Sequence, residues 1–499
     1  MPKRLFLCLS VVTIMTYTSI SHAIGEPQFP RWRGFNLIQK INADRHNGPF
    51  HEEDFQMISE LGFNFVRLPM DYRCWIKNKD WTQIDEDALK EIDQAVAWGK
   101  KYGIHVCLNF HRAPGWTVAS PPEERTVWSD TAAQRVCAMH WQTFARRYKG
   151  IPSSELSFNL FNEPHDVEEP AHDNVVTMIV DSIRAVDPDR LIFSDGTMWG
   201  LLPCEGLVHL EIGQSHHCYL PEQLTHYRSW VEESKTWPMP RWPLPLVNRY
   251  LHGDAKKIIQ TPLVIAGDIK KGTIIRIRVH QVSLHSVLQV YSDSSKIWEK
   301  DFTPGPGAGE WKKSDSLPGG TGFAALYDND YTVTLAAPAK KLQFYNLKGD
   351  WMTVTEIGFL PPRSRSKKEF VLLLDNVNDN YRQSTVTFNP RAADPFMAEK
   401  YRDRDWVWNR WEQTWWDLAM KGVPVMVQEF GVLNKTPHDV TLRWMEDVLS
   451  LWKKAGWGWA LWNLEGSFGV MDSKRKDVVY EDYKGHKLDR AMLELLKKY

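Results

Sequence analysis

The 499-residue chain has little of several features that would place a protein in a familiar class. It has six cysteines, none in a Cys-x-x-Cys pair, which argues against a disulfide framework and against a zinc site. Its 61 basic and 62 acidic residues nearly cancel, so no charge surplus indicates nucleic acid or an anionic membrane as a partner. No apolar run reaches the roughly 20 residues of a membrane-spanning helix.

The first residues follow the order of a secretory signal peptide. Lys3 and Arg4 precede an apolar run from Leu5 to Met15, and Ser21-His22-Ala23 resembles a signal-peptide cleavage site with small residues. The alternative, an N-terminal membrane anchor, is less favoured because the run is short. We expect cleavage near Ala23 and a secreted or periplasmic mature protein. Its five scattered cysteines allow at most one or two bridges, whose pairing stays open: Cys74, Cys107, Cys137, Cys204 and Cys218.

Strand-like apolar runs alternate with helical patterns through much of the chain, which indicates βαβ units and a parallel sheet. Leu89, Ile92 and Val96, for example, have helical spacing, and Gly103 ends that helix. Eight strands are expected, at 34–36, 63–69, 104–110, 156–161, 191–194, 214–219, 423–430 and 458–463. The fold class predicted is α/β, a (β/α)8 TIM barrel, which takes about 250 residues.

A further amphipathic helix is predicted in the last part of the chain, where the barrel pattern returns. Trp408, Trp411, Trp415 and Leu418 share one helical face, and Gly422 follows them. Tryptophans in this pattern are expected to pack against the barrel rather than to bind a ligand.

The segment from about Ala255 to Asp375 has a different residue pattern from the barrel, with short strand-like runs and turns. Thr273–Val279 and Tyr331–Leu335 alternate in polarity, and turns such as Pro304–Gly307 separate such runs. We predict a small β-sandwich-like domain, with the texture of a carbohydrate-binding module, inserted into the barrel; the alternative is an elaborated barrel loop. The predicted division is signal peptide 1–23, first barrel part 24–254, insert 255–375 and second barrel part 376–499.

Polar residues stand where the predicted strands end, the edge at which TIM barrels carry their active sites. Strand four ends in Asn162-Glu163-Pro164 and strand seven in Gln428-Glu429-Phe430. Two facing carboxyl groups suit glycoside hydrolysis, because one protonates the leaving oxygen and the other stabilises or traps an oxocarbenium-like centre. A retaining enzyme needs them about 5–5.5 Å apart, which is within reach across a barrel mouth.

These residues give the chain a resemblance to glycoside hydrolase family 5, the cellulase-type family of clan A. Its members carry an arginine, a histidine, an Asn-Glu pair, a His-x-Tyr pair, a second glutamate and a tryptophan in that order. The resemblance covers about Arg31–Trp230 and Asn389 to the C-terminus, and not the insert. The matching residues are Arg67, His111, Asn162, Glu163, His217, Tyr219, Glu429 and Trp462.

The resemblance implies that Glu163 is the general acid/base and Glu429 the nucleophile. Neither a metal nor an organic cofactor is expected, since the acid–nucleophile pair suffices for the chemistry. Asn162 is expected to donate to the sugar 2-hydroxyl. Tyr219 and Arg67 are expected to hold Glu429 ionised and to lower its pKa.

The remaining matches are expected to support the substrate. His217 is placed near Glu163, His111 against the bound sugar, and Trp462 under the sugar ring as a stacking surface. His216 and His226 are expected to be structural or peripheral. Gln428 stands where many family members have glycine, and we expect its bulky polar side chain to reshape the sugar site next to Glu429.

The leading interpretation is a retaining endo-β-1,4-glucanase acting on a carbohydrate polymer. The 24 tryptophans agree with sugar binding, since indole rings stack on the apolar faces of sugars. One alternative is an exo-acting glycosidase on a mannoside, a xyloside or a furanoside such as an arabinofuranoside. Another, of a different class, is a carbohydrate-binding protein without turnover. The oligomeric state is not indicated.

Overall fold

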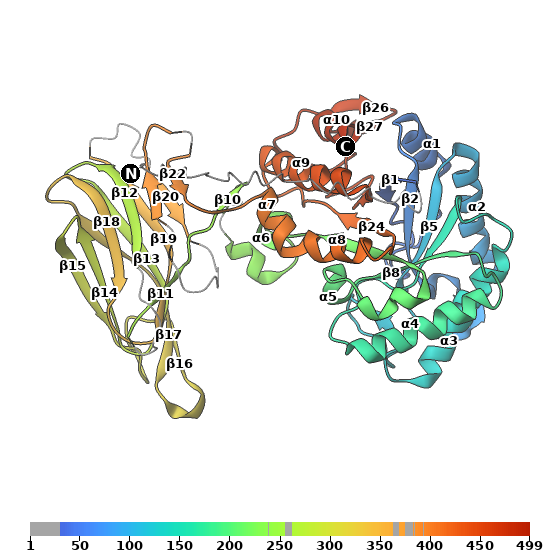
Figure 1. Ribbon diagram of the computed structural model, residues 1–499, viewed down its shortest axis with the longest axis horizontal. Coiled ribbons are helices and arrows are strands. Elements are labelled where there is room, and N and C mark those ends of the chain that lie inside the picture. The colour runs from blue at the N-terminus through green and yellow to red at the C-terminus, as the bar shows by residue number, and fades with distance from the viewer. Residues whose placement is uncertain are drawn as a thin grey trace, which may run out of the picture.

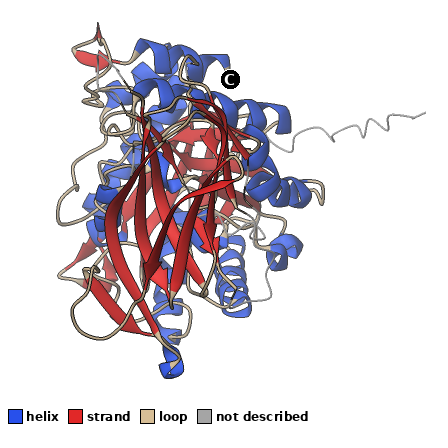
Figure 2. Ribbon diagram, turned by 90° about the vertical axis from the view of Figure 1, so that its left-hand side faces the viewer, coloured by secondary structure: helices blue, strands red, loops and turns tan. Residues whose placement is uncertain are grey.

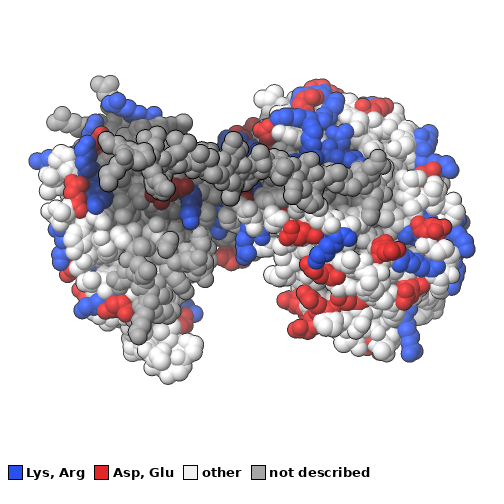
Figure 3. Space-filling view, in the orientation of Figure 1, with Lys and Arg blue, Asp and Glu red and all other residues white. Residues whose placement is uncertain are grey.

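The computed structural model describes residues 30–237, 239–254, 262–362, 369–374, 383, 385–392 and 394–499. The predicted signal peptide and the predicted domain limits at Ala255 and Asp375 lie outside the described residues. Among the described helices, none combines the length and the apolar character needed to cross a membrane. Basic and acidic side chains are interspersed over the face of the barrel drawn in Figure 3.

Within the described residues, eight parallel strands close a barrel (Figure 1). Each strand pairs with the next in chain order, and the last pairs with the first. The strands are β1 (Arg33–Asn36), β2 (Phe65–Asp71), β5 (His105–Ala113), β7 (Leu156–Asn159), β8 (Leu191–Asp195), β9 (Gly213–Cys218), β24 (Val425–Phe430) and β25 (Gly458–Leu461). All eight overlap the ranges expected from the sequence, so the TIM-barrel prediction is confirmed.

Helices surround this barrel and bury their apolar faces against it. In α2, the Asp85 side chain accepts from the Asp87 amide at the start, Gly103 ends the helix in a left-handed conformation, and Leu89 and Ile92 are buried as predicted. The helices are α1 (Glu52–Glu60), α2 (Glu86–Tyr102), α3 (Thr131–Arg147), α4 (Glu169–Arg184), α5 (Thr197–Gly200), α6 (Glu222–Thr225), α7 (Arg404–Val407), α8 (Gln413–Ala419), α9 (His438–Ala455) and α10 (Arg490–Lys498). Short strands lie outside the barrel wall: β3 (Ile76–Lys77), β4 (Asp80–Ile84), β6 (Trp116–Thr117), β26 (Glu481–Tyr483) and β27 (His486–Leu488).

The predicted helix near Trp408 is interrupted by a π-helical turn, Trp408–Glu412, between α7 and α8. Trp415 and Leu418 are fully buried as expected, but Trp408 and Trp411 are only partly buried. Trp408 still packs against the barrel core, as predicted, although the wider turn changes the helical phase. The charged side chain of Glu412 is fully buried instead.

The middle of the chain forms a β-sandwich with a hydrophobic core of its own (Figure 2). One sheet has the order β11 (Tyr250–His252), β19 (Trp351–Leu360), β13 (Ile274–Ser283), β17 (Phe323–Thr334) and β16 (Lys313–Ser316), and β20 (Phe370–Leu373) also pairs with β19. The other has the order β15 (Ser295–Phe302), β14 (Ser286–Ser292), β18 (Ala339–Asn346), β12 (Leu263–Ile269), β21 (Thr385–Phe388) and β22 (Phe396–Ala398). Strands β11, β21 and β22 lie outside the predicted 255–375 range but belong to these sheets.

The chain leaves the barrel after β9 and returns before β24, so the sandwich is an insertion. In Figure 1 the two bodies stand side by side, and a ribbon of β10 (Leu244–Pro245) and β23 (Tyr401–Arg402) lies between them. Trp242, just before β10, is tied to α9 in two places. Its indole donates to Asp447 Oδ2 at 2.9 Å, and its carbonyl accepts from Arg443 Nε at 2.9 Å.

Gly34 is a point at which the barrel tolerates no side chain. A Cβ added there would lie 1.7 Å from the Phe65 carbonyl oxygen, on the neighbouring strand. We predict that Gly34→Ala lowers the free energy of unfolding by about 3 kcal/mol or more. Gly48→Ala is the control, since a Cβ there meets nothing within 4 Å. Thermal unfolding measures both, and equal melting temperatures for the two variants would contradict the prediction.

Candidate active site

A β-bulge in β24 aims Glu429 at the barrel mouth. Val427 pairs with His216 and Glu429 with His217, so Gln428 is the extra residue between them. The Gln428 side chain is fully buried, with Oε1 3.7 Å from the Cys107 sulfur. The bulge turns the Gln428 side chain into the barrel, and the expected effect of this residue on the sugar site stays a prediction.

The guanidinium of Arg67 on β2 is fully buried and joins the groups at the mouth. Burial lowers the pKa of Arg67, but the charges of Glu429 and Asp195 outweigh burial and raise this pKa above its usual value. The side chain therefore stays cationic. Its hydrogen bonds tie it to residues of β1, β7 and β24 and to Asn162, which follows β7. The acceptors are Asn36 Oδ1 at 3.2 Å, Asn159 Oδ1 and Asn162 Oδ1 at 3.0 Å each, and Glu429 Oε1.

Glu163 follows β7 and is held in an unusual backbone conformation. Its φ is +52°, in the left-handed region that glutamate rarely adopts. The Glu163 amide donates to Asp195 Oδ2 at 3.0 Å, and Glu163 Oε1 lies 2.9 Å from His217 Nδ1. Its side chain is 17% exposed, whereas that of Glu429 is 4% exposed. The mouth therefore presents Glu163 more openly to a ligand.

His217 on β9 is shared by three carboxylates. Its Nδ1 lies 2.9 Å from Glu163 Oε1 and 3.7 Å from Glu429 Oε2, and its Nε2 lies 3.1 Å from Asp195 Oδ2. Burial lowers the pKa of His217, but Asp195 and Glu429 outweigh it and raise the pKa to about 10. At neutral pH His217 is therefore an imidazolium.

The two candidate glutamates face each other at short range. One carboxylate oxygen from each of Glu163 and Glu429, and a ring nitrogen of His217, all lie within 4.8 Å of one another. Carboxyl groups in retaining glycosidases are about 5–5.5 Å apart, and those of inverting enzymes about 6.5–9.5 Å. The arrangement fits the retaining class.

The electrostatic balance at Glu429 differs from the expectation. Burial raises the pKa of the Glu429 carboxyl, and the charge of Glu163 acts in the same direction. The charges of His217 and Arg67 lower the pKa but do not outweigh burial. The expected net lowering is wrong because it left out the desolvation of a carboxyl group that is almost completely enclosed.

The other expected residues gather around this pair. Tyr219 Oη donates to Glu429 Oε2 at 3.1 Å. The rings of His111 and Trp462 are stacked, with centroids 5.5 Å apart. Burial holds the pKa of His111 well below its usual value, so this ring is neutral. Within the described part of the chain, His111 Nδ1 and Asn162 Nδ2 are buried without a hydrogen-bond partner, which leaves them for a ligand.

Sequence reasoning missed Asp195, the last residue of β8. Burial raises the pKa of Asp195, but the charges of His217 and Arg67 outweigh it and hold the pKa well below its usual range. Its Oδ1 accepts from Asn159 Nδ2 at 2.7 Å. The rule that strand ends carry polar residues would have found Asp195 had the fifth predicted strand been followed one residue further.

The two histidines expected to be peripheral do not contact either glutamate. His226 packs on Tyr219 with ring centroids 5.2 Å apart, and burial lowers its pKa to about 4. His216 faces the outer helix and lies 3.3 Å from Glu412 Oε1.

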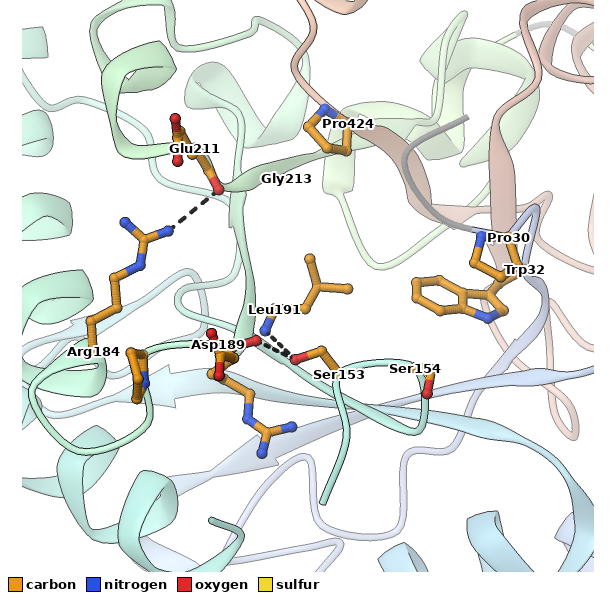
Figure 4. Close-up of a pocket in the computed structure, with 12 residues that line it drawn as sticks. Pro30, Trp32, Ser153, Ser154, Arg184, Asp189, Leu191, Glu211, Gly213 and Pro424 are labelled. Atoms are coloured by element: carbon orange, nitrogen blue, oxygen red, sulfur yellow. Dashed lines mark hydrogen bonds between the residues drawn. The ribbon is translucent and has the colours of Figure 1, made fainter. Parts of the chain in front are cut away.

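A separate cavity of about 390 Å³ lies at the opposite end of the barrel (Figure 4). Leu191 and Gly213, the first residues of β8 and β9, line it together with Trp32 and Ser153. Ser153 Oγ accepts from the Leu191 amide at 2.8 Å and donates to the Asp189 carbonyl at 2.6 Å. None of the eight expected site residues lines this cavity, and residues at this end of a TIM barrel serve stability.

Comparison with curated proteins gives relatives of the first barrel part. Endoglucanase C of Acetivibrio thermocellus is 29% identical over 188 residues, 37% of this chain and 54% of that protein. Cellodextrinase A of Ruminococcus flavefaciens is 28% identical over 184 residues, 35% and 53% of the two chains. A probable glucan 1,3-beta-glucosidase A of Aspergillus fumigatus is 31% identical over 156 residues, 29% and 36%. The chain thus spans about half the length, or less, of these relatives.

Among solved structures, a glycoside hydrolase is 27% identical with a TM-score of 0.60, covering 94% of this chain and 99% of that one. Endoglucanase Cel5A of Thermotoga maritima, at 16% identity and a TM-score of 0.52, covers 93% and 96% and shares the fold. Residues 26–223 match the model of the family described as cellulase, glycosyl hydrolase family 5. The first barrel part, which carries Glu163, is therefore similar to glycoside hydrolase family 5.

Proposed function

We propose that the protein is a retaining glycoside hydrolase, with Glu163 as acid/base and Glu429 as nucleophile. The observation that carries this proposal is the approach of the two carboxylates to within 4.8 Å of each other and of His217. A carbohydrate-binding protein without turnover would not need two carboxylates held this close, because their repulsion costs stability.

In the first step Glu429 attacks the anomeric carbon while Glu163 gives its proton to the leaving oxygen. The hydrogen bonds from Arg67 and Tyr219 hold Glu429 for this attack. In the second step Glu163 takes a proton from water, which attacks the glycosyl ester and frees Glu429. Asn162 Nδ2 is the donor available for the sugar 2-hydroxyl, where a contact strengthens in the transition state.

For the substrate we propose a β-1,4-glucan cleaved internally. Exposed tryptophans follow two strands next to the glutamates: Trp199 is 44% and Trp230 72% exposed. The Trp199 ring stacks on the His165 ring with centroids 4.5 Å apart, and the ring centroids of Trp230 and His226 are 5.4 Å apart. Indoles placed apart from Trp462 suit a substrate of several sugar units. Relatives named endoglucanase and cellodextrinase support this choice, and export by the predicted signal peptide would bring the enzyme to such polymers.

The first prediction concerns the two glutamates. Glu163→Gln is expected to lower kcat/KM on a soluble glucan by about 10²–10⁴-fold, because protonation of the leaving group is lost. On an aryl glycoside with an acidic phenol the loss should be smaller, since that leaving group needs no proton. Glu429→Gln should lose activity on both substrates. Initial rates measure this, and unchanged activity in either variant on the glucan would overturn the assignment.

The second prediction concerns pH. His217→Asn removes the cation that lowers the pKa of Glu429, so this pKa rises. The acid limb of the kcat/KM profile should therefore move to higher pH, by about 1 unit or more. His226→Asn is the control, since with a pKa of about 4 its ring is neutral over the working range. An acid limb that stays in place in His217→Asn, or that shifts equally in both variants, would refute this account.

The third prediction concerns the mode of cleavage. On soluble β-1,4-glucan the enzyme is expected to lower viscosity early and to release mixed oligomers. Release of single sugars from chain ends, with viscosity nearly unchanged, would instead favour exo action. The product panel should include β-1,3-glucan, mannan, xylan and aryl arabinofuranoside.

A further inference from the structure

A second group of potential ligands lies on the outer side of β9, away from the mouth. His216, Cys218 and Glu412 each bring one ligand atom within 4.8 Å of the others. Glu412 and His216 are fully buried, and Cys218 is 3% exposed. His217 lies between His216 and Cys218 in the sequence, and Tyr219 follows them. These two residues contact the catalytic glutamates. The strand therefore carries the two sites on opposite faces.

The helix changes its geometry to bring Glu412 to this place. Glu412 is the last residue of the π-helical turn, after which α8 resumes. A regular helix would continue the apolar face predicted through Trp411 and Trp415. The π turn, a form often found at functional sites, buries a carboxylate there instead. Burying a carboxylate without a compensating charge is costly, so Glu412 calls for a positive partner.

The hydrogen bonds of His216 leave its second nitrogen directed at an acceptor. Nδ1 lies 2.9 Å from the Gly200 carbonyl oxygen, which makes Nδ1 the protonated nitrogen. In the neutral ring, Nε2 then carries a lone pair, yet it lies 3.3 Å from Glu412 Oε1. Glu412 Oε2 has no hydrogen-bond partner among the described residues. A cation between these atoms would satisfy all of them.

The distance between His216 and Glu412 fits a zinc ion. Zinc bonds of about 2.0–2.3 Å to nitrogen, oxygen and sulfur place tetrahedral ligands about 3.3–3.7 Å apart. The nitrogen–oxygen distance of 3.3 Å between His216 and Glu412 lies in this range. Metal-binding histidines also usually donate their other N–H to a carbonyl or carboxylate, as His216 does to Gly200.

We propose that His216 Nε2, the Cys218 sulfur and Glu412 bind one Zn²⁺ ion. The metal replaces the thiol proton, which passes to solvent, so a thiolate and a carboxylate balance the two positive charges. The ion would fasten β9 to the helix and so position His217 and Tyr219 in the mouth.

The test begins with the metal content of the wild-type enzyme. The full chain is produced without a metal-binding tag in zinc-supplemented medium and analysed by mass spectrometry of the elements. About one zinc per chain is expected. Replacement by Co²⁺ should add a thiolate-to-cobalt charge-transfer band. Far less than one zinc per chain, together with no such band, would overturn the proposal and leave a buried proton-bridged pair.

Variants locate the ion. Cys218→Ala and Glu412→Gln are expected to lose the zinc. Cys137→Ala, at an equally buried cysteine, should keep it. Glu429→Gln should also keep it, whereas zinc loss in that variant would place the ion in the mouth and contradict the proposal. Zinc retained in Cys218→Ala would do the same. If Cys218→Ala does not fold, the charge-transfer band of the wild type decides, because that band requires a cysteine ligand.

Discussion

The buried ion pair between Arg67 and Glu429 is the interaction on which the active site depends. Arg67 holds Glu429, the proposed nucleophile, and also donates to Asn159 and Asn162, so one cation fixes groups from several strands. Such a pair stays in the interior only when its remaining hydrogen bonds are satisfied. His217 supplies the second cation and lies against Glu163, Glu429 and Asp195. These two cations therefore offset the repulsion between Glu163 and Glu429, the proposed acid and nucleophile.

The barrel provides this arrangement through strand geometry rather than through flexible loops. The bulge at Gln428 turns Glu429 into the mouth, and alternation along β9 directs His217 and Tyr219 inward while His216 and Cys218 face the helix. The inserted sandwich has its own core and joins the barrel through β10 and β23. The proposed zinc site lies at the same strand, on the side that packs against the returning chain.

Much of this could be predicted from the sequence, because periodicity and strand-end residues are local signals. The eight strands and the position of each expected residue at the mouth follow from them. Three features could not be predicted. The bulge at Gln428 and the π turn at Glu412 change the phase of an element, which residue spacing does not reveal. The net pKa of Glu429 depends on burial, which arises only when distant strands close the barrel. Glu412, likewise, lies 196 residues from His216.

The most direct test of the central claim is to trap the covalent intermediate. A 2-fluoro glucoside with a good leaving group slows hydrolysis of the glycosyl ester, so the ester accumulates, and peptide mass spectrometry then locates it. The account predicts one sugar per chain, attached to the peptide that contains Glu429 and absent from Glu429→Gln. A sugar attached elsewhere, or turnover with inverted configuration and no adduct, would contradict it.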